Sequence, residues 1–417
     1  MSAACQGDGF GADLTTDRES RDSGNFAGLY PPVYYFAMSL FAGDDLQSSA
    51  LVMRAVNALF FVGLVTAVFF LLPVRRRPTL LIALAVTLVP LGMTLIPSNN
   101  PSGWAILSAG TLWIALLGYF ETTGIRRALL GVVAAVATLV GAGARADSAL
   151  YAGVAILVVV ALTARRGRDY LILAILPFTL SLIAAAAFLG SSQSSAIGTG
   201  LTAEVQGNST YELIVQNFLE LPALLTGGLG TWNLGWFDTA LPAIVPFAAC
   251  AALGGAILIG IASPGRRKSW AAFAVLALVV SVPMYLLYKS DALVGTQVQP
   301  RYILPLIVLL VGIVLLESPG RPLSATRGQV FALAGGIVVA NAVSLHATMR
   351  RYVTGTGVTG GNLDSGAEWW WDIPISPMTV WAVGSVAFAA SVFLLSLMWL
   401  ARARTTQAED WAQPVLR

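Results

Sequence analysis

Two arginines at the edges of apolar segments have the side chains best suited to bind a phosphate group. Arg145 precedes Asp147 in "GAGARADSAL", and Arg301 lies between Gln299 and Tyr302 in "GTQVQPRYILPLI". A guanidinium donates two parallel hydrogen bonds to a phosphate, and a charge at a membrane boundary is costly unless it is paired or used. Two interpretations stay open for each arginine. Arg145 either pairs with Asp147 or contacts a headgroup, and Arg301 either reaches surface lipid phosphates or belongs to a binding site.

Three further polar patches interrupt the apolar sequence. "SNNPSGW" contains Asn99 and Asn100, "GTWNLGWFDTALP" contains Trp236 and Asp238, and "GAEWWWDIP" holds three consecutive tryptophans. Asn-Pro and Ser-Gly are typical of tight turns, whereas tryptophans either bind sugars or form the aromatic belt of a membrane protein. Arg54, near the end of an apolar run, is a further candidate. Together the patches predict a binding site on one membrane face.

The composition predicts a protein embedded in lipid. Hydrophobic residues make up 57% of the chain and charged residues only 11%, with a mean hydropathy of +0.76. A soluble domain carries about 25% charged residues. Apolar runs of about 17–25 residues span a bilayer as helices. We therefore predict an all-α fold, a polytopic transmembrane bundle of about 11 helices with an external loop region. The predicted spans are 51–72, 79–96, 102–120, 128–144, 148–164, 170–189, 239–262, 270–288, 301–317, 328–346 and 377–401.

The connections between these spans alternate in charge. One set is short and basic, including "RRRP", "GIRRA", "RRGRD" and "GRRKS", and with the C-terminal tail it holds about sixteen of the 24 Lys and Arg residues. The positive-inside rule makes this set cytoplasmic, and the longer, acidic, Trp-rich set external. We expect a multi-pass protein of the plasma membrane with a cytoplasmic C-terminus.

The same alternation divides the chain into segments. The predicted segments are an external N-terminal loop with an interfacial helix (1–50), a first transmembrane block (51–189), a large external loop (190–238), a second transmembrane block (239–401) with an external loop at 347–376, and a cytoplasmic tail (402–417). An external polar segment without a preceding helix is unusual, so we expect a further helix upstream.

Several classes of function are disfavoured. Apart from Glu317 at the very end of the span 301–317, the predicted spans contain no Asp, Glu or Lys, whereas ion-coupled transporters keep such groups near the bilayer midplane. The basic residues form short clusters between apolar spans, which is untypical of a nucleic-acid partner. A single histidine, His346, argues against a histidine metal centre, and two cysteines, Cys5 and Cys250, are too few for a disulfide framework.

Six motifs occur in an order that resembles a known family. They are "YPPVYY", "SNNPSGW", "ARADSALY", "LGWFDTALP", "VQPRYILPL" and "WWW". From about Gly24 to Trp399, the chain resembles a bacterial multi-pass membrane family common in actinobacteria, the domain of unknown function 2142. That family is similar to the GT-C glycosyltransferases, integral enzymes that take a sugar from a polyprenyl-phosphate carrier on the outer membrane face.

The resemblance implies a role in cell-envelope glycan assembly. A sugar would pass, with inversion, from a polyprenyl-phosphate-linked donor to a glycan or lipid acceptor, and membrane lipids would surround the site. Arg145 and Arg301 would hold the phosphate, in some members with a divalent cation. The sugar or acceptor pocket would be lined by Asn99, Asn100, Trp236 and Asp238.

The acidic pair that the family carries after its first helix is not in this sequence. Asp22 and Asp147 are the remaining candidates for a catalytic carboxylate. Without such a base the chain would be an inactive relative that binds its ligand. A lipid-linked glycan flippase or transporter and a non-catalytic membrane scaffold are the alternative functions.

Overall fold

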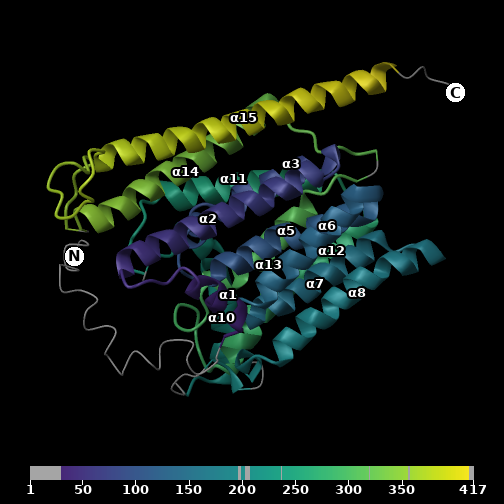
Figure 1. Ribbon diagram of the computed structural model, residues 1–417, viewed down its shortest axis with the longest axis horizontal. Helices are drawn as coiled ribbons and strands as arrows, with labels where there is room; N and C mark the ends of the chain where they lie inside the picture. The colour runs from purple at the N-terminus through teal and green to yellow at the C-terminus, as the bar shows by residue number, and fades with distance from the viewer. Residues whose placement is uncertain are drawn as a thin grey trace.

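The computed structural model describes residues 30–195, 199–201, 207–235, 237–318, 320–355 and 357–412. Within these ranges the chain is helical, and β-structure is limited to two isolated bridges, Leu234 with Thr239 and Ser318 with Arg321. Figure 1 shows the long helices running side by side as one bundle. The predicted fold class, an all-α polytopic helical bundle, is confirmed.

Ten helical stretches in the described ranges are long and apolar enough to cross a membrane. Nine of them correspond to predicted spans. They are α2 (Leu46–Leu71), α5 (Ser102–Glu121), α6 (Gly124–Ala142), α7 (Ala146–Thr163), α8 (Arg168–Leu189), α11 (Ile244–Ile261), α12 (Arg266–Lys289), α14 (Arg327–Val353) and α15 (Pro377–Ala412).

The other two predicted spans are shorter than expected. The predicted span 79–96 is divided into α3 (Arg77–Leu88) and α4 (Leu91–Leu95), because Pro90 lacks a backbone N–H and disfavours helical geometry at the residue before it. The predicted span 301–317 is the 15-residue helix α13 (Pro300–Val314). Protein surrounds most of α13, which packs on α3, α5 and α12 and therefore does not need the length of a lipid-exposed span.

Part of the predicted external loop 190–238 is helical. A π-helical turn (η6, Glu212–Gln216), α10 (Asn217–Thr226) and a second π-helical turn (η7, Gly227–Thr231) form a continuous apolar stretch of 20 residues. In Figure 1, α10 lies at the same end of the bundle as the short helix α1 (Pro32–Ser39). Gly230 has φ = 103°, which ends the helical path. The sequence analysis missed this element because its prolines and glycines are typical of loops.

The helix α5 lies at the centre of the bundle. It packs against α2, α3, α6, α7 and α13, and most of its side chains are buried. Its Trp113 is 1% exposed and lies against Gly312 of α13. A Cβ added at Gly312 would lie 2.3 Å from the Trp113 ring. The close approach of α5 and α13 therefore depends on a glycine at this position.

The two ends of the bundle have different chemistry. The end that we call the basic end carries the connections 72–76, 122–123, 164–167, 262–265 and 315–326, and the opposite end, the aromatic end, carries 96–101, 143–145, 232–243, 290–299 and 354–376. At the basic end, the buried Lys268 ammonium donates hydrogen bonds to the carbonyl oxygens of Gly260, Ser263 and Leu316, at 2.7–2.8 Å. Lys268 thereby joins the C-terminal ends of α11 and α13.

Replacing Gly312 by alanine is expected to lower the stability of the protein by about 1–3 kcal/mol, because the added methyl group overlaps the buried Trp113 ring. Gly335→Ala on α14 is the matched control, since a Cβ there meets nothing within 4 Å. Thermal unfolding of both variants in detergent measures the difference. Equal unfolding temperatures would show that the α5–α13 contact tolerates a larger side chain.

Candidate functional site

The break between α6 and α7 positions Arg145. The helix α6 ends at Ala142, and α7 begins at Ala146, with Arg145 as its extended N-cap residue. The Tyr34 N–H of α1 donates to the Gly143 carbonyl at 3.2 Å. A Cβ at Gly143 would lie 2.5 Å from Val33, so α1 can approach this break only because residue 143 is glycine.

Arg145 and Asp147 form a buried, two-pronged ion pair. Arg145 Nε donates to Asp147 Oδ1 at 2.9 Å and Nη2 donates to Oδ2 at 2.7 Å, and Oδ1 also accepts the Ser148 N–H at 2.8 Å. The arginine is 7% exposed. Burial works against its charged form, but the adjacent Asp147 carboxylate outweighs burial and raises the pKa of Arg145 above its usual range. Arg145 is thus a permanent, oriented cation.

Aromatic rings surround the arginine. Its guanidinium carbon lies 4.7 Å from the centre of the Tyr302 ring and 6.0 Å from that of Tyr30. The guanidinium carbon of Arg301 lies 5.4 Å from the same Tyr302 ring. We call Tyr30, Arg145, Asp147, Arg301 and Tyr302 the arginine–tyrosine cluster. The cluster joins residues from three predicted motifs that are far apart in the sequence.

Arg301 has no counter-ion in the described part of the chain. Its Nε is buried and lacks a hydrogen-bond partner there. The cluster therefore contains two guanidinium groups and one carboxylate. Arg301 also stands in the first turn of α13, where free backbone N–H groups add positive potential. Gln299, another predicted site residue, is the N-cap of α13 but makes no capping hydrogen bond with its side chain. This arrangement favours an anion.

Tyr34 connects the cluster to the predicted turn at "SNNPSGW", because its ring contacts Tyr35, which in turn contacts Tyr30 of the cluster. Its ring lies edge-on to that of Trp104, 5.1 Å between centres, and the Trp104 indole donates to Asn57 Oδ1 at 2.9 Å. The Asn57 amide in turn donates to the Ser98 carbonyl at 3.0 Å. This network packs α1 and α2 against the start of α5.

Three predicted site residues support this turn, and their hydrogen bonds go to the turn or to α2 and not to the cluster. Arg54 donates to the Pro97 carbonyl at 3.2 Å, and Asn99 donates to the Ala50 carbonyl at 3.5 Å. Asn100 Oδ1 accepts the Ser102 N–H at 2.9 Å and so helps to begin α5. The interpretation as an interhelical turn accounts for all three contacts.

Asp238 belongs to a second ion pair at the aromatic end. Its Oδ2 accepts a hydrogen bond from Arg351 Nε at 2.7 Å, which ties the turn before α11 to the last turn of α14. Burial raises the pKa of Asp238, but the hydrogen bond and positive charge of Arg351 outweigh this effect, so the pKa is lower than usual. Trp236, the neighbouring candidate, lies outside the described residues, as does Asp22.

A cavity of about 340 Å³ lies between the 232–237 turn and the connection before α13. It is lined by Thr231, Trp232, Asn233, Phe237, Gly295 and Thr296. Thr296 is five residues from Arg301 in sequence. The sequence analysis named neither Trp232 nor Tyr30 as a site residue, although both lie in quoted motifs. Both were missed because their contacts are with residues far away in the sequence.

Metal binding finds no support in the described ranges, which contain no group of three or more His, Cys, Asp or Glu side chains placed to hold an ion. The divalent cation stays a prediction from the resemblance. Asp147 is the candidate carboxylate that the structure describes, and both of its oxygens are engaged by Arg145.

The fold and the cluster define a polytopic helical membrane protein with a buried cationic site at one end. The chain belongs to the family described as "Predicted membrane protein (DUF2142)", which matches residues 11–310. The matched region contains the whole arginine–tyrosine cluster and ends before α14. No curated protein and no solved structure matches the chain. The resemblance to this family is confirmed, and the activity has to be argued from the site.

Replacing Asp147 by asparagine is expected to lower the free energy of unfolding by about 3 kcal/mol, because the buried Arg145 charge loses its counter-ion. Asp238→Asn is the control. The Asp238 side chain is 36% exposed, so its pair with Arg351 is expected to contribute about 1 kcal/mol or less. Thermal unfolding in detergent ranks the two variants. A larger loss in Asp238→Asn would contradict the structural role of Asp147.

The Asp238 pair should also depend on pH. Its pKa is lower in the folded chain than in the unfolded chain, so its stabilising contribution is present above the ordinary pKa of about 4 and is lost as the pH falls through the folded value. The unfolding temperatures of the wild type and Asp238→Asn should therefore differ at pH 7 and converge towards pH 3. A constant difference across this range would exclude an ionised Asp238 as the cause.

Proposed function

We propose that the chain binds the phosphate group of a polyprenyl-phosphate-linked sugar at the arginine–tyrosine cluster, as a glycosyltransferase-like protein of cell-envelope glycan assembly. The observation that carries the proposal is the uneven charge of this cluster. Arg145 and Arg301 approach the same Tyr302 ring, while Asp147 is the carboxylate bonded to the first of them.

Charge and desolvation favour a phosphate as the ligand. A buried N–H without a partner carries a desolvation cost, and Arg301 Nε is such a group. A phosphate oxygen would supply the missing acceptor with a charge-assisted hydrogen bond. Asp147 holds the Arg145 fork in a fixed direction, so less side-chain entropy is lost when the anion binds.

The surroundings favour a sugar that remains attached to a membrane lipid. The cluster lies where α7 and α13 begin, so an isoprenoid tail can stay in the hydrocarbon while its phosphate contacts the arginines. The cavity lined by Trp232, Asn233 and Thr296 offers an aromatic face and amide and hydroxyl groups, which are suited to sugar hydroxyls. We place the aromatic end outside the cytoplasm of a plasma-membrane protein, on the charge of the opposite connections.

Transfer would need the arginines chiefly as the sugar leaves its carrier. A base takes the proton of the acceptor hydroxyl, the acceptor oxygen bonds to the anomeric carbon, and the bond from that carbon to the phosphate oxygen breaks. The two guanidinium groups would stabilise the negative charge on the departing polyprenyl phosphate. Asp147 orients Arg145 in this proposal, because both of its carboxylate oxygens accept hydrogen bonds from that arginine. The base would come from the acceptor complex or from a carboxylate outside the described residues.

The proposal is tested by binding of a polyprenyl-phosphate-linked sugar to the full chain in lipid nanodiscs. Arg301→Gln is expected to weaken binding by about tenfold or more, because a charge-assisted hydrogen bond is lost. Arg54→Gln, at the same end but bonded to the Pro97 carbonyl, should bind as the wild type does. Equal affinities in all three proteins would reject the cluster as the phosphate site.

A labelled donor separates transfer from binding. Release of polyprenyl phosphate that requires an envelope-glycan acceptor, and that falls in Arg301→Gln, supports the enzymatic half of the proposal. Tight binding with no release from any acceptor would overturn that half and leave a binding protein.

A further inference from the structure

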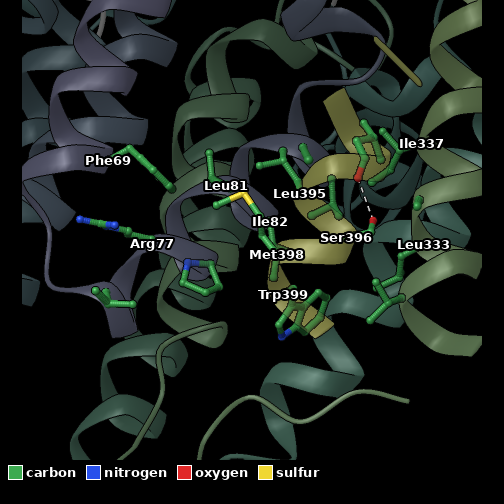
Figure 2. Close-up of a pocket in the computed structure, with 17 residues that line it drawn as sticks. Phe69, Arg77, Leu81, Ile82, Leu333, Ile337, Leu395, Ser396, Met398 and Trp399 are labelled. Carbon is green, nitrogen blue, oxygen red and sulfur yellow. Dashed lines mark hydrogen bonds between the residues drawn. The ribbon is translucent and has the colours of Figure 1, made fainter. Parts of the chain in front are cut away.

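A second cavity lies far from the arginine–tyrosine cluster, in the half of the bundle nearest the basic end. It has a volume of about 320 Å³ and is an apolar groove between α3, α14 and α15. Figure 2 shows Leu81 and Ile82 of α3 facing Leu395 and Met398 of α15, with Ile337 of α14 on the far wall. The groove exists because α15 packs extensively on α14 alone among the described helices.

The groove runs along the helices and not across them. Its α3 wall extends from Pro78 to Val86, which is eight residue steps and corresponds to about 12 Å along a helix. One leaflet contributes about half of the 30 Å hydrocarbon core of a bilayer. The groove therefore has the direction and the depth of one acyl chain in the leaflet at the basic end.

A cationic side chain stands at the rim of this groove. Arg77 is the first residue of α3, and its guanidinium carbon lies 5.0 Å from the centre of the Phe69 ring of α2. Its Nη2 donates to the Phe70 carbonyl at 3.2 Å, while Nε is buried without a hydrogen-bond partner in the described part of the chain. An arginine has five N–H donors, so most of those of Arg77 lack an acceptor in the described protein.

We propose that this groove binds an anionic phospholipid of the leaflet at the basic end, with one acyl chain against α3, α14 and α15 and the phosphate on Arg77. The acyl chain packs against the apolar walls of the groove, and the lipid phosphate accepts hydrogen bonds from Arg77. Trp399 lines the groove two residues before the apolar stretch of α15 ends at Ala401, and an indole near the end of a span suits the headgroup region. The bound lipid fills the space between α3 and α15 and makes α15 part of the bundle. This inference is independent of the proposed function at the aromatic end.

The experiment uses the full chain, freed of lipid in detergent and titrated with phosphatidylglycerol or with diacylglycerol of the same acyl chains. Native mass spectrometry counts the retained lipids. The wild type is expected to retain one phosphatidylglycerol about tenfold more tightly than diacylglycerol, because the latter has no phosphate. Arg77→Gln should remove this preference. Arg166→Gln, an exposed arginine at the same end, should keep it.

A second pair of variants tests whether an acyl chain occupies the apolar groove. Ala334→Phe places a ring inside the groove and should abolish retention of both lipids, whereas Ala332→Phe, exposed on the same helix and outside the groove, should leave retention unchanged. Equal retention of phosphatidylglycerol and diacylglycerol by the wild type, or unchanged retention in Ala334→Phe, would overturn the proposal. A dimer that disappears in Ala334→Phe would also overturn it, because a second copy would then occupy the groove.

Discussion

Helix ends inside a membrane protein need hydrogen-bond partners that lipid cannot supply. Long side chains meet much of this need here. Lys268 binds carbonyls at the ends of α11 and α13, and the buried Asn217 amide donates to the Ala292 carbonyl at 2.9 Å and accepts from the Val294 N–H at 2.9 Å. The irregular segments, such as the short α13 and the break before α7, are tolerated because the groups that they expose are satisfied within the protein.

The same requirement produces the cationic site. The break between α6 and α7 brings Arg145 into the protein, where it is stable only because Asp147 pairs with it. The first turn of α13 brings Arg301 to the same Tyr302 ring, without a comparable partner in the described part of the chain. The ion-paired Arg145 and the candidate ligand-binding Arg301 therefore lie next to the same ring. Arg301 differs from Arg145 because it has no carboxylate partner in the described part of the chain.

Most of the helices could be predicted from the sequence, but the contacts between residues of different helices could not. Nine spans followed from apolar length, and the Arg145–Asp147 pair was one of two open interpretations. The break at Pro90 could have been predicted from proline chemistry, but the helix 212–231 could not, because its prolines and glycines favour a loop until α11, α12 and α13 pack against it. Arg54, Asn99 and Asn100 were grouped with the arginines on a shared face. Their hydrogen bonds hold the turn and its contact with α2, since residues on one face of a bundle need not share contacts.

The attachment of α15 has a consequence for biogenesis. Both arginines of the cluster, the central helix α5 and the Lys268 junction precede α14 in the chain, and α15 is synthesised only after them. The larger buried core contains no residue of α15, whose Phe388 and Trp399 pack only at the edge of the smaller one. The membrane-inserted chain can thus complete its main core while α15 is still in the ribosome or the translocon. Docking of α15 onto α14 then becomes a late, separable step of assembly, open to competition from surrounding lipids.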